Sequence, residues 1–119
     1  MLDLYDLLRQ IEQKPGMYIG TPSIRNLYMF LNGYQFARRQ MKLPLSTQEQ
    51  EFRAFQPWLQ KTFDTKTSVS WCELILAQSS DEIDAFTNFF TFWQTFVYER
   101  QASKTTNGHM TNVLETTQL

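Results

Sequence analysis

Few side chains in this sequence have the chemistry for nucleophilic or acid–base catalysis. His109 is the only histidine and Cys72 the only cysteine. A Cys–His or Ser–His–Asp site needs a nucleophile and a base within hydrogen-bond distance, but His109 lies in a polar segment far from Cys72 in the sequence. We interpret Cys72 as a small apolar residue of a helix. The sequence therefore predicts no catalytic residue, no cofactor site and a protein that is not an enzyme.

Acidic residues are the second group of side chains that could form a functional site. Between Thr67 and Tyr98 the sequence has four acids and no lysine or arginine; these acids are Glu73, Asp81, Glu82 and Asp84. Neighbouring acids in the first turn of a helix usually complement the helix dipole rather than bind a metal ion, so no metal site is predicted. The acids should instead make one end of the protein locally negative, where they face either solvent or a basic partner surface.

The segment Lys14–Gly20, which we call the elbow, has an unusual composition for a loop. Pro15 fixes its own φ angle, while Gly16 and Gly20 allow backbone angles that other residues avoid. The apolar residues between the two glycines predict that the elbow packs onto a core. The glycines would then let another backbone or a ligand approach closely. Tyr18 is the best candidate in the elbow for a side chain whose polar tip borders a groove.

Apolar spacing and capping residues predict the helices that carry these side chains. Apolar residues at i, i+3, i+4 and i+7 indicate a first helix over about residues 2–13. Thr21 followed by Pro22 predicts the start of a long second helix that ends near residue 41. Three capping boxes predict further helix starts: Ser46–Glu49, Ser70–Glu73 and Ser79–Glu82. Pro57 should interrupt the helix that begins at Ser46, near residues 54–57.

The last predicted helix, over about residues 80–101, has seven aromatic side chains within thirteen residues. A helix that is apolar on most of its circumference is normally central, because one packing face cannot cover so many rings. The expected fold is therefore all-α, a compact bundle of five to six helices around this aromatic-rich C-terminal helix. The polar composition after Ala102 predicts one helical domain over residues 1–102 and a tail over 103–119. Trp58 and Trp71 are expected either to join the core or, if partly exposed, to anchor a partner.

Length and charge limit the class of protein. A chain of 119 residues forms about one domain, and 11 basic residues against 12 acidic ones give a net charge of −1. That balance provides no overall positive field, so neither nucleic acid nor an anionic membrane is an expected partner. A single cysteine fits a reducing compartment, and neither a secretory signal nor a membrane-spanning segment is evident. We therefore predict a cytoplasmic protein.

The elbow resembles a known nucleotide-binding segment. Residues 15–20 match the Arg-Pro-Gly-Met-Tyr-Ile-Gly segment of the gyrase-type ATPases of the GHKL superfamily, where that segment lies beside the nucleotide. The resemblance implies an alternative function, a small-molecule or nucleotide-binding module that uses the elbow. The superfamily's catalytic Glu-x-x-Asp-Asn pattern has no counterpart, since residues 24–41 contain no acid, and its Asp-x-Gly-x-Gly signature is absent. Nucleotide hydrolysis is therefore not expected.

A wider resemblance covers most of the chain. The run from Pro15 to Ala37 (Pro-Gly-Met-Tyr-Ile-Gly-x-x-Ser-Ile-x-x-Leu-x-x-Phe-Leu-x-Gly-Tyr-x-x-Ala) is similar to that of a group of small bacterial proteins, as are Phe52-x-x-Phe55 and Ser70-Trp71. Such proteins are often proposed as immunity partners of polymorphic or contact-dependent growth inhibition toxins. The resemblance implies a non-enzymatic immunity protein that forms a heterodimer with a cognate toxin, expected to be a nuclease, and occludes its surface. The interface expected on that basis uses Glu73, Asp81, Glu82, Asp84, Trp71 and Tyr18.

Overall fold

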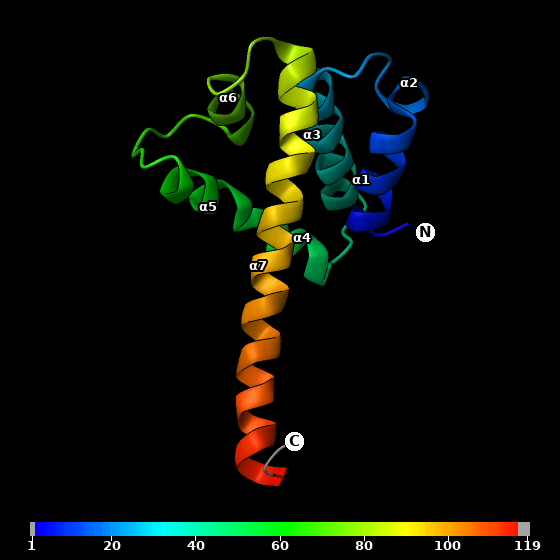
Figure 1. Cartoon of the computed structure of the whole chain (residues 1–119). Helices are drawn as coiled ribbons and strands as arrows, with labels where there is room; N and C mark the ends of the chain where they lie inside the picture. The colour runs from blue at the N-terminus through cyan, green and yellow to red at the C-terminus, as the bar shows by residue number, and fades with distance from the viewer. Residues whose placement is uncertain (1, 117–119) are drawn as a thin grey trace.

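The computed structural model describes the backbone of residues 2–116 and the side chains of residues 2–103. Within this part of the chain all regular structure is helical, so the predicted all-α class is confirmed. The helices are α1 (Leu4–Gln13), α2 (Pro15–Tyr18), α3 (Ile24–Gln40), α4 (Thr47–Arg53), α5 (Phe55–Thr62), α6 (Trp71–Leu76) and α7 (Glu82–Thr116). The elbow itself contributes the single helical turn α2. Figure 1 shows the other helices gathered around the N-terminal half of α7, as predicted for the aromatic helix.

Serine side chains are the N-caps of three helices. In α4 the capping box is complete, because Ser46 Oγ accepts from the Glu49 N–H at 3.1 Å and Glu49 Oε1 accepts from the Ser46 N–H at 3.0 Å. Ser70 Oγ caps α6 by accepting from a first-turn N–H. The predicted cap of α3 at Thr21 is wrong. Ser23 is the N-cap, and its hydroxyl accepts from two backbone N–H groups of the first turn.

The interruption predicted near residues 54–57 is confirmed. α4 ends at Arg53 and α5 begins at Phe55, with Ala54 between them. Pro57 lies in the first turn of α5, where a missing backbone N–H removes no helical hydrogen bond. Because the helix is divided there, α4 contacts α1 while α5 contacts α6 and α7.

α7 is longer than the sequence predicts. The expected end lies near residue 101, but the helix continues to Thr116 and extends beyond the other helices (Figure 1). Residues 102–107 contain neither glycine nor proline, so nothing but their polarity argues against continuing the helix, and polarity alone does not stop it. The side chain of His109 and all others after residue 103 lie outside the described residues. The division into a domain over 1–102 and a tail over 103–119 therefore stays a prediction.

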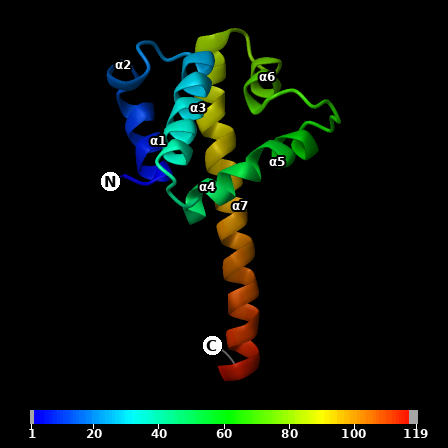
Figure 2. The same ribbon diagram turned by 180° about the vertical axis from the view of Figure 1, so that it is seen from behind.

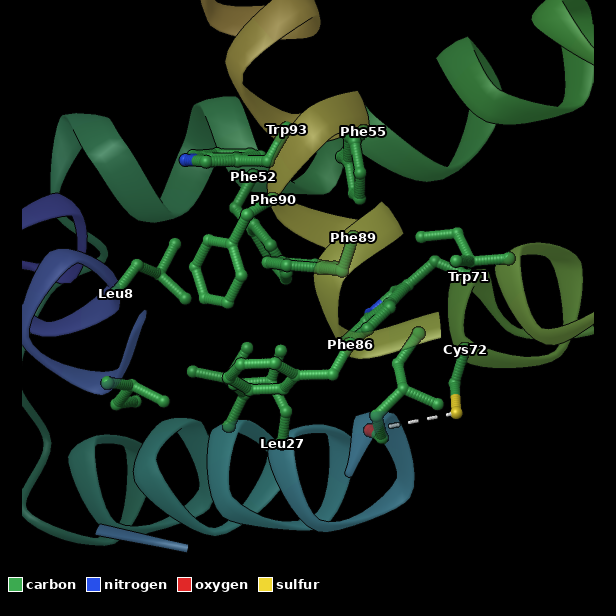
Figure 3. Packing of buried hydrophobic residues seen from close by; sticks show 14 of the residues in the cluster. Leu8, Leu27, Phe52, Phe55, Trp71, Cys72, Phe86, Phe89, Phe90 and Trp93 are labelled. Carbon is green, nitrogen blue, oxygen red and sulfur yellow. Dashed lines mark hydrogen bonds between the residues drawn. The ribbon is translucent and has the colours of Figure 1, made fainter. Parts of the chain in front are cut away.

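Aromatic rings from α4, α5, α6 and α7 form the centre of the core (Figure 3). Phe55 is fully buried, and its ring centroid lies within 6.5 Å of six others. These six rings belong to Phe52, Trp58, Trp71, Phe89, Trp93 and Phe96. Aromatic pairs of this kind add about 0.5–1.5 kcal/mol each to the stabilisation from apolar burial. The cluster thus determines how four of the helices pack together.

Candidate functional site

The four acids predicted to form a negative surface lie at one end of the molecule. Glu73 belongs to α6, Asp81 directly precedes α7, and Glu82 and Asp84 lie in its first turn. We call these four residues the acidic end. In Figure 1 the elbow and the start of α3 lie at the same end of the bundle as the starts of α6 and α7. The fold therefore gathers acids that the sequence places in two separate helices.

Arg25, in the first turn of α3, pairs with two residues of the acidic end. Its Nη1 lies 2.6 Å from Glu73 Oε2, and its Nε lies 3.5 Å from Glu82 Oε2. Glu82 Oε1 also accepts a hydrogen bond from Ser23 Oγ at 2.5 Å. The hydrogen bond from Arg25 to Glu73 raises the pKa of the guanidinium, which keeps it charged. The Arg25 guanidinium offsets only part of the charge of these four carboxylates, so the acidic end remains negative, though less so than the acids alone predict.

Sequence reasoning missed Arg25, although a signal for its role was present. A cation in the first turn of a helix opposes the helix dipole, so it is expected there only when an acid compensates it. Glu73 lies 48 residues further along the chain, and nothing local in the sequence connects the two. The charge at the start of α3 could have suggested an acidic partner but not which one.

Two residues of the acidic end cap α7. The Asp84 N–H donates to Asp81 Oδ1 at 2.7 Å, and the Ser80 N–H donates to Asp84 Oδ2 at 2.9 Å. The predicted capping box between Ser79 and Glu82 is therefore wrong, and Ser79 Oγ instead donates to a backbone carbonyl of α6. Within the described residues, no group of three or more histidine, cysteine or acidic side chains is placed to hold a metal ion. Asp81 and Asp84 thus stabilise the start of α7, and a substitution that tests their charge must preserve these cap hydrogen bonds.

Trp71 belongs to the core. Only 7% of its surface is exposed, and its ring packs edge-on against Tyr28 and Phe52, with centroid distances of 5.2 and 5.9 Å. The expectation that Trp71 takes part in a partner interface is corrected by this burial. Trp58 is half-buried, and its Nε1 donates to Glu99 Oε1 at 2.9 Å.

Cys72 is buried beside the start of α3. Its Sγ lies 3.9 Å from the carbonyl oxygen of Ile24, and Figure 3 shows this contact as a dashed line. Burial is the main reason why the pKa of the thiol is raised to about 11, and the nearby Glu73 adds to the effect. A thiol with such a pKa is protonated at neutral pH and is a poor nucleophile. The interpretation of Cys72 as a small apolar core residue therefore agrees with its surroundings.

The elbow is held by its own backbone and by Asn26. The N–H groups of Met17 and Ile19 donate within the elbow, at 3.1 and 2.8 Å, and Asn26 Nδ2 donates to the Ile19 carbonyl at 2.8 Å. Gly20 has a φ of +83°, a left-handed angle that favours glycine. The prediction that the apolar residues of the elbow pack onto the core holds for Ile19, which is buried, but is wrong for Met17, which is 72% exposed. Since the N–H groups of Met17 and Ile19 are already engaged, these two are not available to a phosphate group.

Tyr18 is one of the residues that line a groove. Its hydroxyl donates to Gln10 Oε1, and its ring packs edge-on against Phe30 with a centroid distance of 6.4 Å. The groove has a volume of about 380 Å³ and lies between α1 and α3. We call it the α1–α3 groove; it is lined by Leu2, Leu7, Tyr18, Phe30, Tyr34, Ala37, Arg38 and Met41. The sequence predicted the tyrosine at its rim but not the groove itself.

No protein-family model, curated protein or solved structure matches this chain. In the part of the chain with a described structure, no helix combines the length and the apolar composition needed to cross a membrane. The candidates for function therefore come from the geometry alone, and they are the acidic end, the elbow with Tyr18, and the α1–α3 groove.

Proposed function

We propose that this chain is a protein-binding module that neutralises a cognate bacterial toxin, a nuclease, by occluding its surface as an immunity protein does. The observation that carries the proposal is the acidic end. It gathers four carboxylates against one guanidinium in a protein whose overall net charge is only −1. A nuclease is positive where it contacts the phosphate backbone, and such a surface is electrostatically complementary to the acidic end.

The acidic end is arranged for contact with a partner. Asp81 is exposed, and the Glu73 and Glu82 side chains are each nearly half exposed. Arg25 and the α7 cap already hold these carboxylates in place, so binding would cost little additional side-chain entropy. Charges of one sign on a fixed surface also increase the rate at which an oppositely charged partner associates.

Tyr18 is the last residue of α2, and Figure 1 shows α2 at the same end of the bundle as the start of α7. Its hydroxyl is held by Gln10 and its ring by Phe30, so the side chain is preorganised. A partner that covered both Tyr18 and the acidic end would combine electrostatic steering with an aromatic anchor. Toxin binding to this surface would block access of the nucleic acid substrate to the basic surface of the toxin.

Co-expression with a toxin encoded by a neighbouring gene tests the proposal. We expect growth to be rescued and the two proteins to purify as a stoichiometric complex. Asp81→Asn is the most informative variant, because asparagine preserves the helix cap while removing the charge. It should slow association several-fold at low ionic strength and make association less sensitive to salt. Asp64→Asn is the matched control, since Asp64 is exposed and lies in a turn with a φ of 52° that asparagine tolerates.

Two results would count against the proposal. A chain that neither protects cells from the toxin nor binds it would contradict the function itself. The chain could instead protect cells while Asp81→Asn and Asp64→Asn change the association rate equally. The toxin-neutralising function would then stand, but the interface would lie outside the acidic end.

A further inference from the structure

α3 and its C-cap residue Met41 carry large apolar side chains that are exposed. Met29, Phe36 and Met41 are 66%, 54% and 60% exposed, and the α1–α3 groove lies directly beside them with Phe30 and Tyr34 in its wall. Figure 2 shows α3 on the side of the molecule facing the viewer, with α7 behind it. Large exposed apolar faces on soluble proteins usually mark interaction sites, and flexible methionine side chains adapt well to a partner surface.

These residues form one continuous strip along the helix. At about 100° per residue, Met29, Gly33 and Phe36 lie on one stripe, and the groove residues Phe30 and Tyr34 lie on the stripe next to it. Arg25 lies on the first stripe one turn before Met29, and Arg38 lies on the second stripe one turn after Tyr34; between these two positions the stripes carry no charged residue. From Met29 to Met41 the strip is about 18 Å long, at a rise of about 1.5 Å per residue.

Gly33 lies at the centre of this strip. It is exposed, it has no positive φ, and a Cβ added to it would contact nothing within 4 Å. Nothing inside the described chain therefore requires glycine, although glycine lowers helix stability relative to alanine. Gly33 is one residue from the midpoint of α3, and the absent side chain leaves a shallow position where another helix backbone can approach closely.

The surroundings of the two ends of α3 have opposite net charge, although α3 itself contains no acid. The N-terminal end of α3 meets the acidic end, through the contacts of Arg25 with Glu73 and Glu82. The C-terminal end carries Arg39 and Lys42. An antiparallel pair of α3 helices related by a two-fold axis near Gly33 would place the acidic end of each copy near the cations of the other. A parallel pair would bring like charges together.

We propose that the α3 face is the interface of a homodimer in which two copies of this chain pack their α3 helices antiparallel about a two-fold axis near Gly33. The interface is self-complementary, as a two-fold interface requires. Met29 of one copy would lie opposite Ala37 of the other, and Phe30 opposite Phe36. The charge distribution selects the antiparallel orientation and a second copy of the chain as the occupant. This inference does not depend on the toxin-neutralising function, although the dimer would bring the acidic end of each copy close to the other copy.

Sedimentation equilibrium of the full chain from low to high micromolar concentration tests the proposal. We expect the wild-type protein to be a dimer and Phe36→Glu to raise the dimer dissociation constant by at least about tenfold. The exposed position of Phe36 should leave the monomer folded, which the circular dichroism spectrum checks. Val69→Glu, at an exposed residue outside α3, is the matched control and should remain dimeric.

Two further variants separate the parts of the argument. Gly33→Leu should weaken the dimer as strongly as Phe36→Glu while raising the melting temperature of the monomer, because leucine is the better helix former. Arg39→Glu should weaken the dimer mainly at low ionic strength. A wild-type protein that stays monomeric at high micromolar concentration would overturn the proposal, and so would a dimer that tolerates both Phe36→Glu and Gly33→Leu.

Discussion

Raising the pH should destabilise the fold through Cys72. The buried thiol keeps its proton until its pKa of about 11, whereas a cysteine in the unfolded chain loses it near 9.0. Between these two values the unfolded chain binds fewer protons than the folded one, so the free energy of unfolding falls as the pH rises. Below pH 9 both states hold the proton, and Cys72 contributes no pH dependence.

The size of the effect follows from the two pKa values. Each pKa unit corresponds to about 1.4 kcal/mol, so the interval from 9.0 to about 11 corresponds to a loss of roughly 2–3 kcal/mol from Cys72. Small domains are stable by only about 5–15 kcal/mol, and this loss is large enough to measure. Tyr5 and Tyr34 should add to it at higher pH, because burial raises the pKa of both phenols as well.

Urea denaturation of the wild-type protein and of Cys72→Ala at a series of pH values between 8 and 11 checks this reasoning. The alanine variant loses stability at every pH because it leaves a small cavity, but the difference between the two proteins should shrink as the pH rises from about 9 to 11. The tyrosines are present in both proteins and cancel in the comparison. A difference that stays constant over this range would refute the assignment of Cys72 as a buried, protonated thiol.

Two further predictions concern the core and the elbow. Phe55→Ala should cost about 3–5 kcal/mol of unfolding free energy, because its ring is fully buried among six others; a loss below 1 kcal/mol in urea denaturation would show that the cluster is not central to stability. Gly20→Ala should cost about 1–2 kcal/mol through its left-handed φ, whereas Gly16→Ala, in the helical turn α2 with open space around it, should stabilise by up to about 1 kcal/mol. Thermal melts of the two variants that shift in the same direction would contradict this distinction.

The helices could be predicted because their signals are local. The capping box at Ser46 and Glu49 and the interruption near Pro57 depend on residues within one turn of each other, and both appear as predicted. The start of α3 was misplaced because Thr21 and Ser23 are both acceptable caps two residues apart. Ser23 also donates a hydrogen bond to Glu82, 59 residues away. A contact between residues so far apart cannot be predicted from the local sequence.

The candidate site shows the same division between local and long-range information. The acids could be placed at one end of the bundle because they flank the connection between two predicted helices. Their pairing with Arg25 and the burial of Trp71 depend on how α3, α4 and α6 pack. The spacing of the apolar residues in α3 correctly predicted a helix. When a helix is apolar on more than one side, however, spacing alone does not show which side faces the core.

The position of the tryptophans has a consequence for spectroscopy. Trp58, Trp71 and Trp93 all contact the same ring, that of Phe55, so the three indoles are near neighbours and act as one optical reporter of the core. Intrinsic fluorescence should therefore change sharply when the protein unfolds. It should change little when a partner covers the acidic end or the α3 face, and affinities at those surfaces are best measured with an external label.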